Sequence, residues 1–177
     1  MGSVVLELPE AVYADLLAHL VQPRSRSEEA AFVFAKAALE GNCVTFQFLD
    51  WTRVPADGFV HRSLFYLELT DEMRGRVIKR AHDLGCSIVE FHSHPASHWA
   101  EFSPSDRAGL REFVPHVWWR LKGRPYVAVV VSPFSFDGLV WLSNANTPQP
   151  LDEIRVGKQV LRPIGCSLRH WKDPDGL

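Results

Sequence analysis

The residues best suited to chemistry in this chain lie close together, in the runs EFHSHP (90–95) and SPSD (103–106). Residues i and i+2 of a β-strand point to the same face, so His92 and His94 can direct both imidazoles at one point. Asp106 follows the helix-capping residue type Ser103 by three positions, and the start of a helix favours an ionised carboxylate. Two histidines and one carboxylate are typical of catalytic zinc, which keeps a fourth position for water. The spacing therefore predicts a zinc site formed by His92, His94 and Asp106.

A zinc site of this kind needs a base, because a water bound to zinc ionises at roughly pH 7 and its proton must be accepted. Glu29 is the candidate, since it stands at the entrance of an apolar strand expected over residues 29–35, where partial burial raises a carboxyl pKa. Side chains alternate along a strand, so only one of Glu28 and Glu29 can face the metal. We expect Glu29 to share a face with Ala31 and Val33 and Glu28 to face solvent, but Glu28 stays open as the alternative base.

Each of these signals alone is also typical of ordinary structure. A His-x-His pair occurs on half-buried strands, and a Ser-Pro-x-Asp run occurs at many capped helix starts. Their conjunction in one chain, after an acidic residue that opens an apolar strand, favours the metal interpretation.

Composition restricts the remaining function classes. The chain has 177 residues, 46% of them hydrophobic and 23% charged, which is typical of one soluble globular domain. Six Trp and eleven Phe supply a core, so a metal would be catalytic and not structural. Lys and Arg total 19 against 21 Asp and Glu, so the chain lacks the excess of basic residues expected of a protein whose main partner is nucleic acid. Three irregularly spaced cysteines, no signal peptide and no long apolar run predict a cytoplasmic protein with reduced thiols and no membrane partner.

Strands that alternate with helices predict an α/β or α+β layered domain with a mixed β-sheet flanked by helices. We expect one domain over residues 1–170 and a frayed tail at 171–177. Two β-rich runs at 44–54 and 59–69 are expected to pair as a hairpin, and a helix is expected from Thr70 as N-cap to Gly85. The other expected strands are 4–8, 29–35, 87–92, 126–131, 139–143 and a weaker one at 154–161, with helices after Pro9 and Ser103.

The glutamate, the HSHP run and the SPSD run together resemble the JAMM (JAB1/MPN/Mov34) metalloproteases, and the short chain resembles their compact bacterial members. The resemblance covers residues 28–109 and, by strand order, extends to 143. It implies a JAMM/MPN-like, cytidine-deaminase-like fold, with His92, His94 and Asp106 as zinc ligands. It also implies Glu29 as general base and acid and Ser103 as a donor to the developing oxyanion. The chain departs from the pattern at two points. Eleven residues separate His94 from Asp106, one more than usual, and Phe32 replaces a glycine.

The activity implied by the resemblance is hydrolysis of the peptide or isopeptide bond after the C-terminal tail of a ubiquitin-like protein, for deconjugation or precursor processing. Such a tail would lie along a sheet edge by strand addition. One alternative is a zinc amidohydrolase acting on a small-molecule or sulfur-carrier-derived substrate, and another is a non-catalytic scaffold that binds ubiquitin-like proteins. A zinc nucleobase deaminase is disfavoured because the chain has no Cys-x-x-Cys. The pattern leaves open whether His98, Trp99, His61 and Trp118 contact a partner or serve only the fold.

Overall fold

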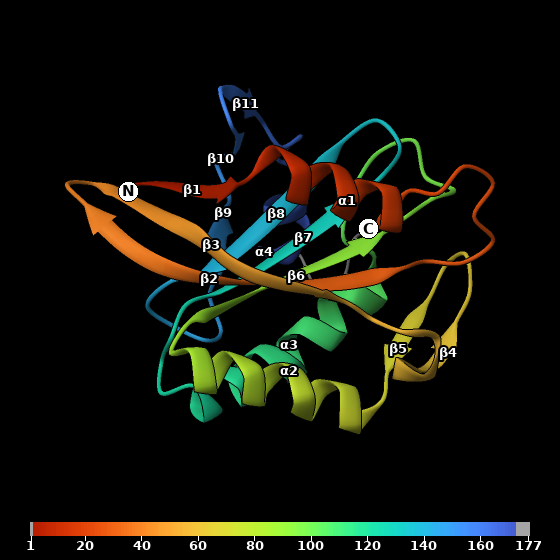
Figure 1. Cartoon of the computed structure of the whole chain (residues 1–177), viewed down its shortest axis with the longest axis horizontal. Helices are drawn as coiled ribbons and strands as arrows, with labels where there is room; N and C mark the ends of the chain where they lie inside the picture. The colour runs from red at the N-terminus through yellow and green to blue at the C-terminus, as the bar shows by residue number, and fades with distance from the viewer. Residues whose placement is uncertain (1, 173–177) are drawn as a thin grey trace.

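The computed structural model describes residues 2–172 and has a mixed α+β architecture. Within these residues a nine-stranded sheet curls between layers of helix, and a small two-stranded sheet stands apart from it (Figure 1). The strands are β1 (Ser3–Leu8), β2 (Ala30–Glu40), β3 (Cys43–Arg53), β4 (Phe59–Arg62), β5 (Leu67–Leu69), β6 (Ser87–Ser93), β7 (Tyr126–Val131), β8 (Phe136–Trp141), β9 (Gln149–Pro150), β10 (Glu153–Val156) and β11 (Gln159–Leu161). The helices are α1 (Glu10–Leu20), α2 (Asp71–Leu84), α3 (Pro104–Arg120) and α4 (Ser167–Lys172), with a 3-10 turn at Ala56–Gly58.

The large sheet is mixed, as the sequence predicts. Its strand order is β11-β10-β1-β3-β2-β6-β7-β8-β9. Strand β1 runs parallel to both of its neighbours, β3 and β10, and β6 runs parallel to β7. The remaining pairs, including β2 with β6, are antiparallel. The coarse prediction of a mixed sheet flanked by helices is therefore confirmed.

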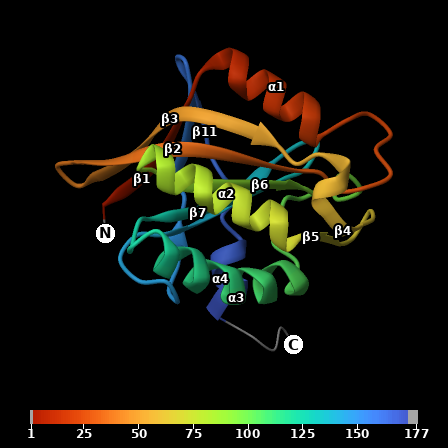
Figure 2. The same ribbon diagram turned by 60° about the horizontal axis from the view of Figure 1, so that its bottom comes forward.

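The central strands are apolar on both faces because helices cover both faces. In Figure 1, α1 covers one face of the sheet, and α2 and α3 cover the other; Figure 2 shows the second layer from the front. Along β2, Ala30, Phe32 and Phe34 pack with α2 and α3, whereas Ala31, Val33 and Ala35 pack with α1. Along β6, Ile88 packs on the α2 and α3 side. Strand alternation then places Glu90 and His92 on that same side.

The predicted helix boundaries at Thr70 and Gly85 are confirmed. The Thr70 hydroxyl accepts a hydrogen bond from the Met73 amide at 3.1 Å, and Gly85 ends α2 in the left-handed region with φ of 65°. Between them Met73, Val77, Ile78 and Ala81 are buried on one face of α2. No helix in the described part of the chain is long and apolar enough to cross a membrane.

The predicted hairpin between residues 44–54 and 59–69 is wrong. Strand β3 pairs with β2 and β1, while residues 59–69 fold back on themselves as β4 and β5. The reason is local: Gly41, with φ of 60°, lies in the tight turn that joins β2 directly to β3. Likewise, Gly157 with φ of 58° lies between β10 and β11, so the single strand expected at 154–161 is two antiparallel strands.

The sequence predicts a frayed tail at residues 171–177, but its first two residues, 171 and 172, belong to helix α4. The Trp171 ring packs on the Trp141 ring at a centroid distance of 5.4 Å, and the Arg111 guanidinium lies 4.6 Å from the centre of the Trp171 ring. These contacts anchor the helix to the α2 and α3 side of the sheet. Residues 173–177 of the expected tail lie outside the described residues.

The buried carboxylate of Asp137 ties this C-terminal region to β8. It accepts hydrogen bonds from the amides of Gly138, Gly165 and Ser167 at 2.9, 3.2 and 2.8 Å. We expect Asp137→Ala to lower the free energy of unfolding by about 3 kcal/mol, because buried amides lose their acceptor. Urea unfolding measures this change. Asp15→Ala, at an exposed position on α1, is the control and should change stability by less than about 0.5 kcal/mol. Equal stability of the two variants would contradict the assignment.

Candidate metal centre

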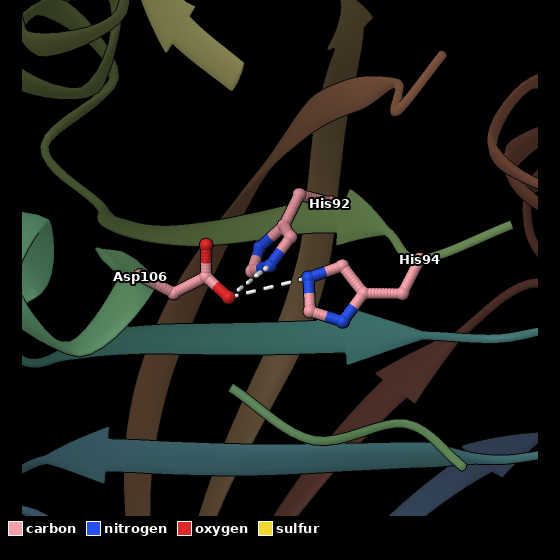
Figure 3. A group of neighbouring side chains, drawn as sticks. All are labelled: His92, His94 and Asp106. Atoms are coloured by element: carbon pink, nitrogen blue, oxygen red, sulfur yellow. Dashed lines mark ion pairs between the residues drawn. The ribbon is translucent and has the colours of Figure 1, made fainter. Parts of the chain in front are cut away.

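His92, His94 and Asp106 converge in one group that could hold a metal ion (Figure 3). Their ligand atoms all lie within 4.8 Å of one another. Asp106 Oδ2 lies 3.5 Å from His92 Nε2 and 3.2 Å from His94 Nε2. For ligands at 2.0–2.1 Å from a tetrahedral ion, the separation between two ligand atoms is about 3.3 Å. The three side chains are therefore spaced as metal ligands are spaced.

Contacts with two residues, Val131 and Phe102, fix the direction of the histidines. His92 lies within β6, and His94 lies one residue beyond its end. The His94 amide donates to the Val131 carbonyl at 2.8 Å, which keeps this residue alongside β7 after β6 has ended. The His92 ring also packs against the ring of the fully buried Phe102, with a centroid distance of 5.5 Å. Both imidazoles consequently point to the α2 and α3 side of the sheet.

The start of α3 fixes the direction of Asp106. Ser103 and Asp106 form a reciprocal capping box: the Ser103 hydroxyl accepts from the Asp106 amide at 3.2 Å, and Asp106 Oδ2 accepts from the Ser103 amide at 2.7 Å. The predicted N-cap is thus confirmed. The same hydrogen bonds that begin the helix aim the Asp106 carboxylate at the two imidazoles.

The charges of the cluster favour a cation between its members. Burial alone would lower the pKa of His92, but the carboxylates of Asp106, Glu90 and Glu28 outweigh burial and raise the pKa to about 9. Burial alone would raise the pKa of Asp106, but the imidazoles of His92 and His94 hold that pKa well below its usual range. The carboxylates of the cluster therefore stabilise positive charge between its members, and a divalent cation would supply that charge.

Two buried polar atoms fit a bound metal. Among the described residues, His92 Nε2 and Glu28 Oε2 have no hydrogen-bond partner. Buried polar groups are almost always hydrogen-bonded, so each unpaired one needs an explanation. A metal ligand explains the nitrogen of His92, and the donor set of two imidazoles and one carboxylate suits zinc.

The glutamate that faces the cluster is Glu28, and the expectation that Glu29 faces it is wrong. The side chain of Glu28 is 2% exposed, and its Oε1 lies 3.6 Å from His94 Nε2. Burial raises the pKa of Glu28, against the lowering effect of His92 and His94. Glu29 instead pairs with Arg62, whose Nη1 donates to both carboxylate oxygens at 2.6 Å.

The pairing of β2 with β6 explains this reversal. Ala30 pairs with His92, and the Ser93 amide donates to the Glu29 carbonyl, so Glu28 comes opposite His94. Ala31 and Val33 do share a face, but it is the α1 face of the sheet, whereas the Glu29 side chain turns to Arg62 of β4. One signal in the sequence favours Glu28: the small residue Ala31 stands three positions after it, where the JAMM pattern has glycine.

Sequence reasoning missed Glu90 and Tyr126, which lie beside the cluster. Glu90 Oε1 lies 3.9 Å from His92 Nδ1, and the Tyr126 hydroxyl donates to Glu90 Oε2. Burial is the main cause that raises the pKa of Glu90, and burial with the neighbouring Glu90 raises the pKa of Tyr126 well above its usual value. Glu90 precedes His92 by two residues, so the strand period alone could have placed it on the same face.

Two surface pockets are lined by members of the cluster. One pocket of about 440 Å³ is lined by His92 and Asp106 together with Arg74 and Phe113. The other, of about 500 Å³, is lined by His94 and Ser103. Ser103 therefore shares a pocket with His94.

The remaining candidates divide between core and surface. Trp118 packs partly buried against the core, whereas the neighbouring Trp119 is exposed. His61 lies on β4, with its ring 5.6 Å from that of Tyr66. His98 and Trp99 form an exposed aromatic group with Phe134, near the second pocket. All three cysteines, Cys43, Cys86 and Cys166, are free thiols.

Comparison with known proteins adds no relative to this description. No protein-family model matches the chain, and no curated protein matches it significantly. The geometry of the cluster and its neighbours is therefore the basis for a function.

Proposed function

We propose that this chain is a zinc hydrolase of the JAMM type that cleaves the amide bond after the C-terminal tail of a ubiquitin-like protein. One observation carries the proposal: His92, His94 and Asp106 converge within 4.8 Å, and the buried carboxylate of Glu28 lies 3.6 Å from His94. A three-ligand site beside an unpaired buried carboxylate is the arrangement of catalytic zinc and its base.

The arrangement of elements also supports the JAMM/MPN, cytidine-deaminase-like fold as a proposal. The histidine pair ends β6, and the aspartate lies in the first turn of the next helix, α3. Glu28 lies two residues before the start of the neighbouring antiparallel strand, β2. This is the chain order of the JAMM pattern.

Each residue near the cluster has a distinct role in this proposal. His92, His94 and Asp106 would hold the zinc ion, which would supply polarisation of the scissile carbonyl and a water molecule with its pKa lowered to about 7. Glu28 accepts a proton from the attacking water as the new carbon–oxygen bond forms. It then delivers that proton to the nitrogen as the carbon–nitrogen bond breaks, which releases an acid and an amine. Burial suits Glu28 to this exchange because it raises the pKa of the carboxyl.

Ser103 provides a separate test of the chemistry. We propose that its hydroxyl donates to the carbonyl oxygen as negative charge develops there, and its place in the pocket beside His94 supports this. Ser103→Ala should lower kcat by about a hundredfold, whereas the lost helix cap should cost only about 1 kcal/mol of stability. Steady-state kinetics and thermal unfolding measure the two effects. Ser103→Thr keeps a hydroxyl and a cap, so it should retain most activity. Full activity with a lowered Tm in Ser103→Ala would leave only the capping role.

The decisive experiment is a cleavage assay. Ubiquitin-like and sulfur-carrier proteins, each extended by a short peptide after the terminal glycine, are incubated with the zinc-loaded protein and analysed by mass spectrometry. We expect release of the peptide, its loss with a chelator, and its return with added zinc. Binding of these proteins without cleavage would favour the scaffold alternative. Cleavage restricted to small amides would favour the small-molecule amidohydrolase.

A further inference from the structure

The β4–β5 hairpin stands apart from the large sheet (Figures 1 and 2), and its residues 66–69 line one pocket with His92 and Asp106. Its strands have only four and three residues, and an isolated two-stranded hairpin is marginally stable in water. It exposes apolar residues: Phe65, at its tip, is 76% exposed and Val60, on β4, is 64% exposed. Contacts with the rest of the chain must therefore hold the hairpin in place.

Two of these contacts reach the adjacent residues Glu28 and Glu29. The Glu28 amide donates to the Ser63 carbonyl, in the hairpin, at 2.7 Å. Arg62 Nη1 donates to both carboxylate oxygens of Glu29 at 2.6 Å, and the two side chains are only 28% and 12% exposed. The Arg62 guanidinium also lies 4.8 Å from the centre of the Phe59 ring. The ion pair is thus partly sheltered from water and forms stronger, charge-assisted hydrogen bonds.

Glu29 is also hydrogen-bonded to Ser93, in the strand that carries His92. The Glu29 amide donates to Ser93 Oγ at 2.9 Å, and the Ser93 amide donates to the Glu29 carbonyl at 2.9 Å. Ser93 lies between the two histidines of the cluster. The segment is therefore held between the hairpin and β6.

Glu28 needs such support because it lies outside the regular strand. Strand β2 begins at Ala30, and residues 21–29 before it contain turns and bends but no helix or strand. The Glu28 carboxylate has one oxygen without a hydrogen bond among the described residues, so side-chain hydrogen bonds alone do not fix its position. The backbone of Glu28 therefore has to fix the position of the carboxylate.

We propose that Arg62 and Glu29 are positioning residues whose ion pair holds the hairpin against residues 28–29 and so keeps the Glu28 carboxylate beside His94. The expected effect on turnover rests on the proposed function. The contact between the hairpin and residues 28–29 is a property of the chain without metal or substrate. A base displaced by about 1 Å can lose about a hundredfold in rate, so a weakened hold should appear mainly in kcat.

Amide hydrogen exchange of the metal-free protein, followed by NMR, directly tests whether the ion pair holds the hairpin against residues 28–29. In Arg62→Gln the exchange of the Glu28 amide should accelerate by about tenfold or more, because its acceptor Ser63 moves more freely. The core amide of Val89 should exchange at the wild-type rate. Arg80→Gln is the matched control, since it removes another arginine–carboxylate pair, with Asp50, away from the hairpin. Unchanged exchange at Glu28 in Arg62→Gln would overturn the proposal.

Steady-state kinetics on the zinc-loaded protein test the consequence. Arg62→Gln and Glu29→Gln should each lower kcat by about tenfold to a hundredfold, with KM within about twofold and zinc content unchanged. The double variant should lose no more than either single variant, because both act through one pair. A normal kcat, or losses that multiply, would reject the positioning role. An inactive wild-type protein would count against the proposed function alone. Hydrogen exchange would then still test whether the Arg62–Glu29 pair holds the hairpin against residues 28–29.

Discussion

Replacing Glu28 by Gln should lower turnover by about a thousandfold or more while zinc stays bound. The amide keeps the size and much of the hydrogen bonding of the side chain but cannot accept the proton of the attacking water. The three proposed ligands are untouched, so the zinc content should remain about one per chain. Steady-state kinetics and metal analysis on the same preparation separate the two quantities.

Two further glutamate variants sharpen this prediction. Glu29→Gln should lose far less activity than Glu28→Gln, because the Glu29 carboxylate contacts Arg62 and acts only through position. Glu40→Gln, at the exposed end of β2, should behave as wild type. If Glu29→Gln were the more damaged variant and Glu28→Gln remained active, the assignment of the base to Glu28 would be wrong.

Removal of one ligand should abolish zinc binding at this site. His94→Ala and Asp106→Ala should each retain less than about a tenth of the wild-type zinc, because two ligands hold the ion much less tightly than three. Asp106→Asn is the informative companion: its side chain can still accept the Ser103 amide in the capping box, but it lacks the charge that zinc needs. Loss of zinc in Asp106→Asn with little change in stability would assign the effect to the ligand and not to the helix. Full zinc in all three variants would refute the site.

The same variants should stay folded without metal. Large apolar clusters cover both faces of the sheet, and neither depends on the three ligands. A chelator should therefore leave the far-UV circular dichroism of the wild-type protein unchanged. Loss of secondary structure on chelation would instead assign the metal a structural role.

The convergence of His92, His94 and Asp106 could be predicted from the sequence because each of its parts is local. The period of a strand brings His92 and His94 to one face, and a serine three residues earlier marks the helix start that carries Asp106. Both features depend on residues within a few positions of each other. The structure bears out this juxtaposition.

The choice between Glu28 and Glu29 could not be made in the same way. Alternation along β2 separates the two side chains, but which of them faces the histidines depends on the register between β2 and β6, strands more than 45 residues apart in the chain. The wrong partner of β3 has a different, local origin: the turn at Gly41 joins β2 directly to β3, so the β-rich run at 59–69 is left to pair with itself. The register between β2 and β6 is non-local, and this is why the sequence could not identify the glutamate.

The two pockets lined by members of the cluster bear on the size of the substrate that the proposed hydrolase would accept. A closed cavity accepts only the end of a chain, because everything beyond the scissile bond must fit inside it. Here the pocket of His92 and Asp106 and the pocket of His94 and Ser103 are both open to the surface. Under the proposed function, a folded protein attached to the scissile bond would therefore not have to fit inside the enzyme.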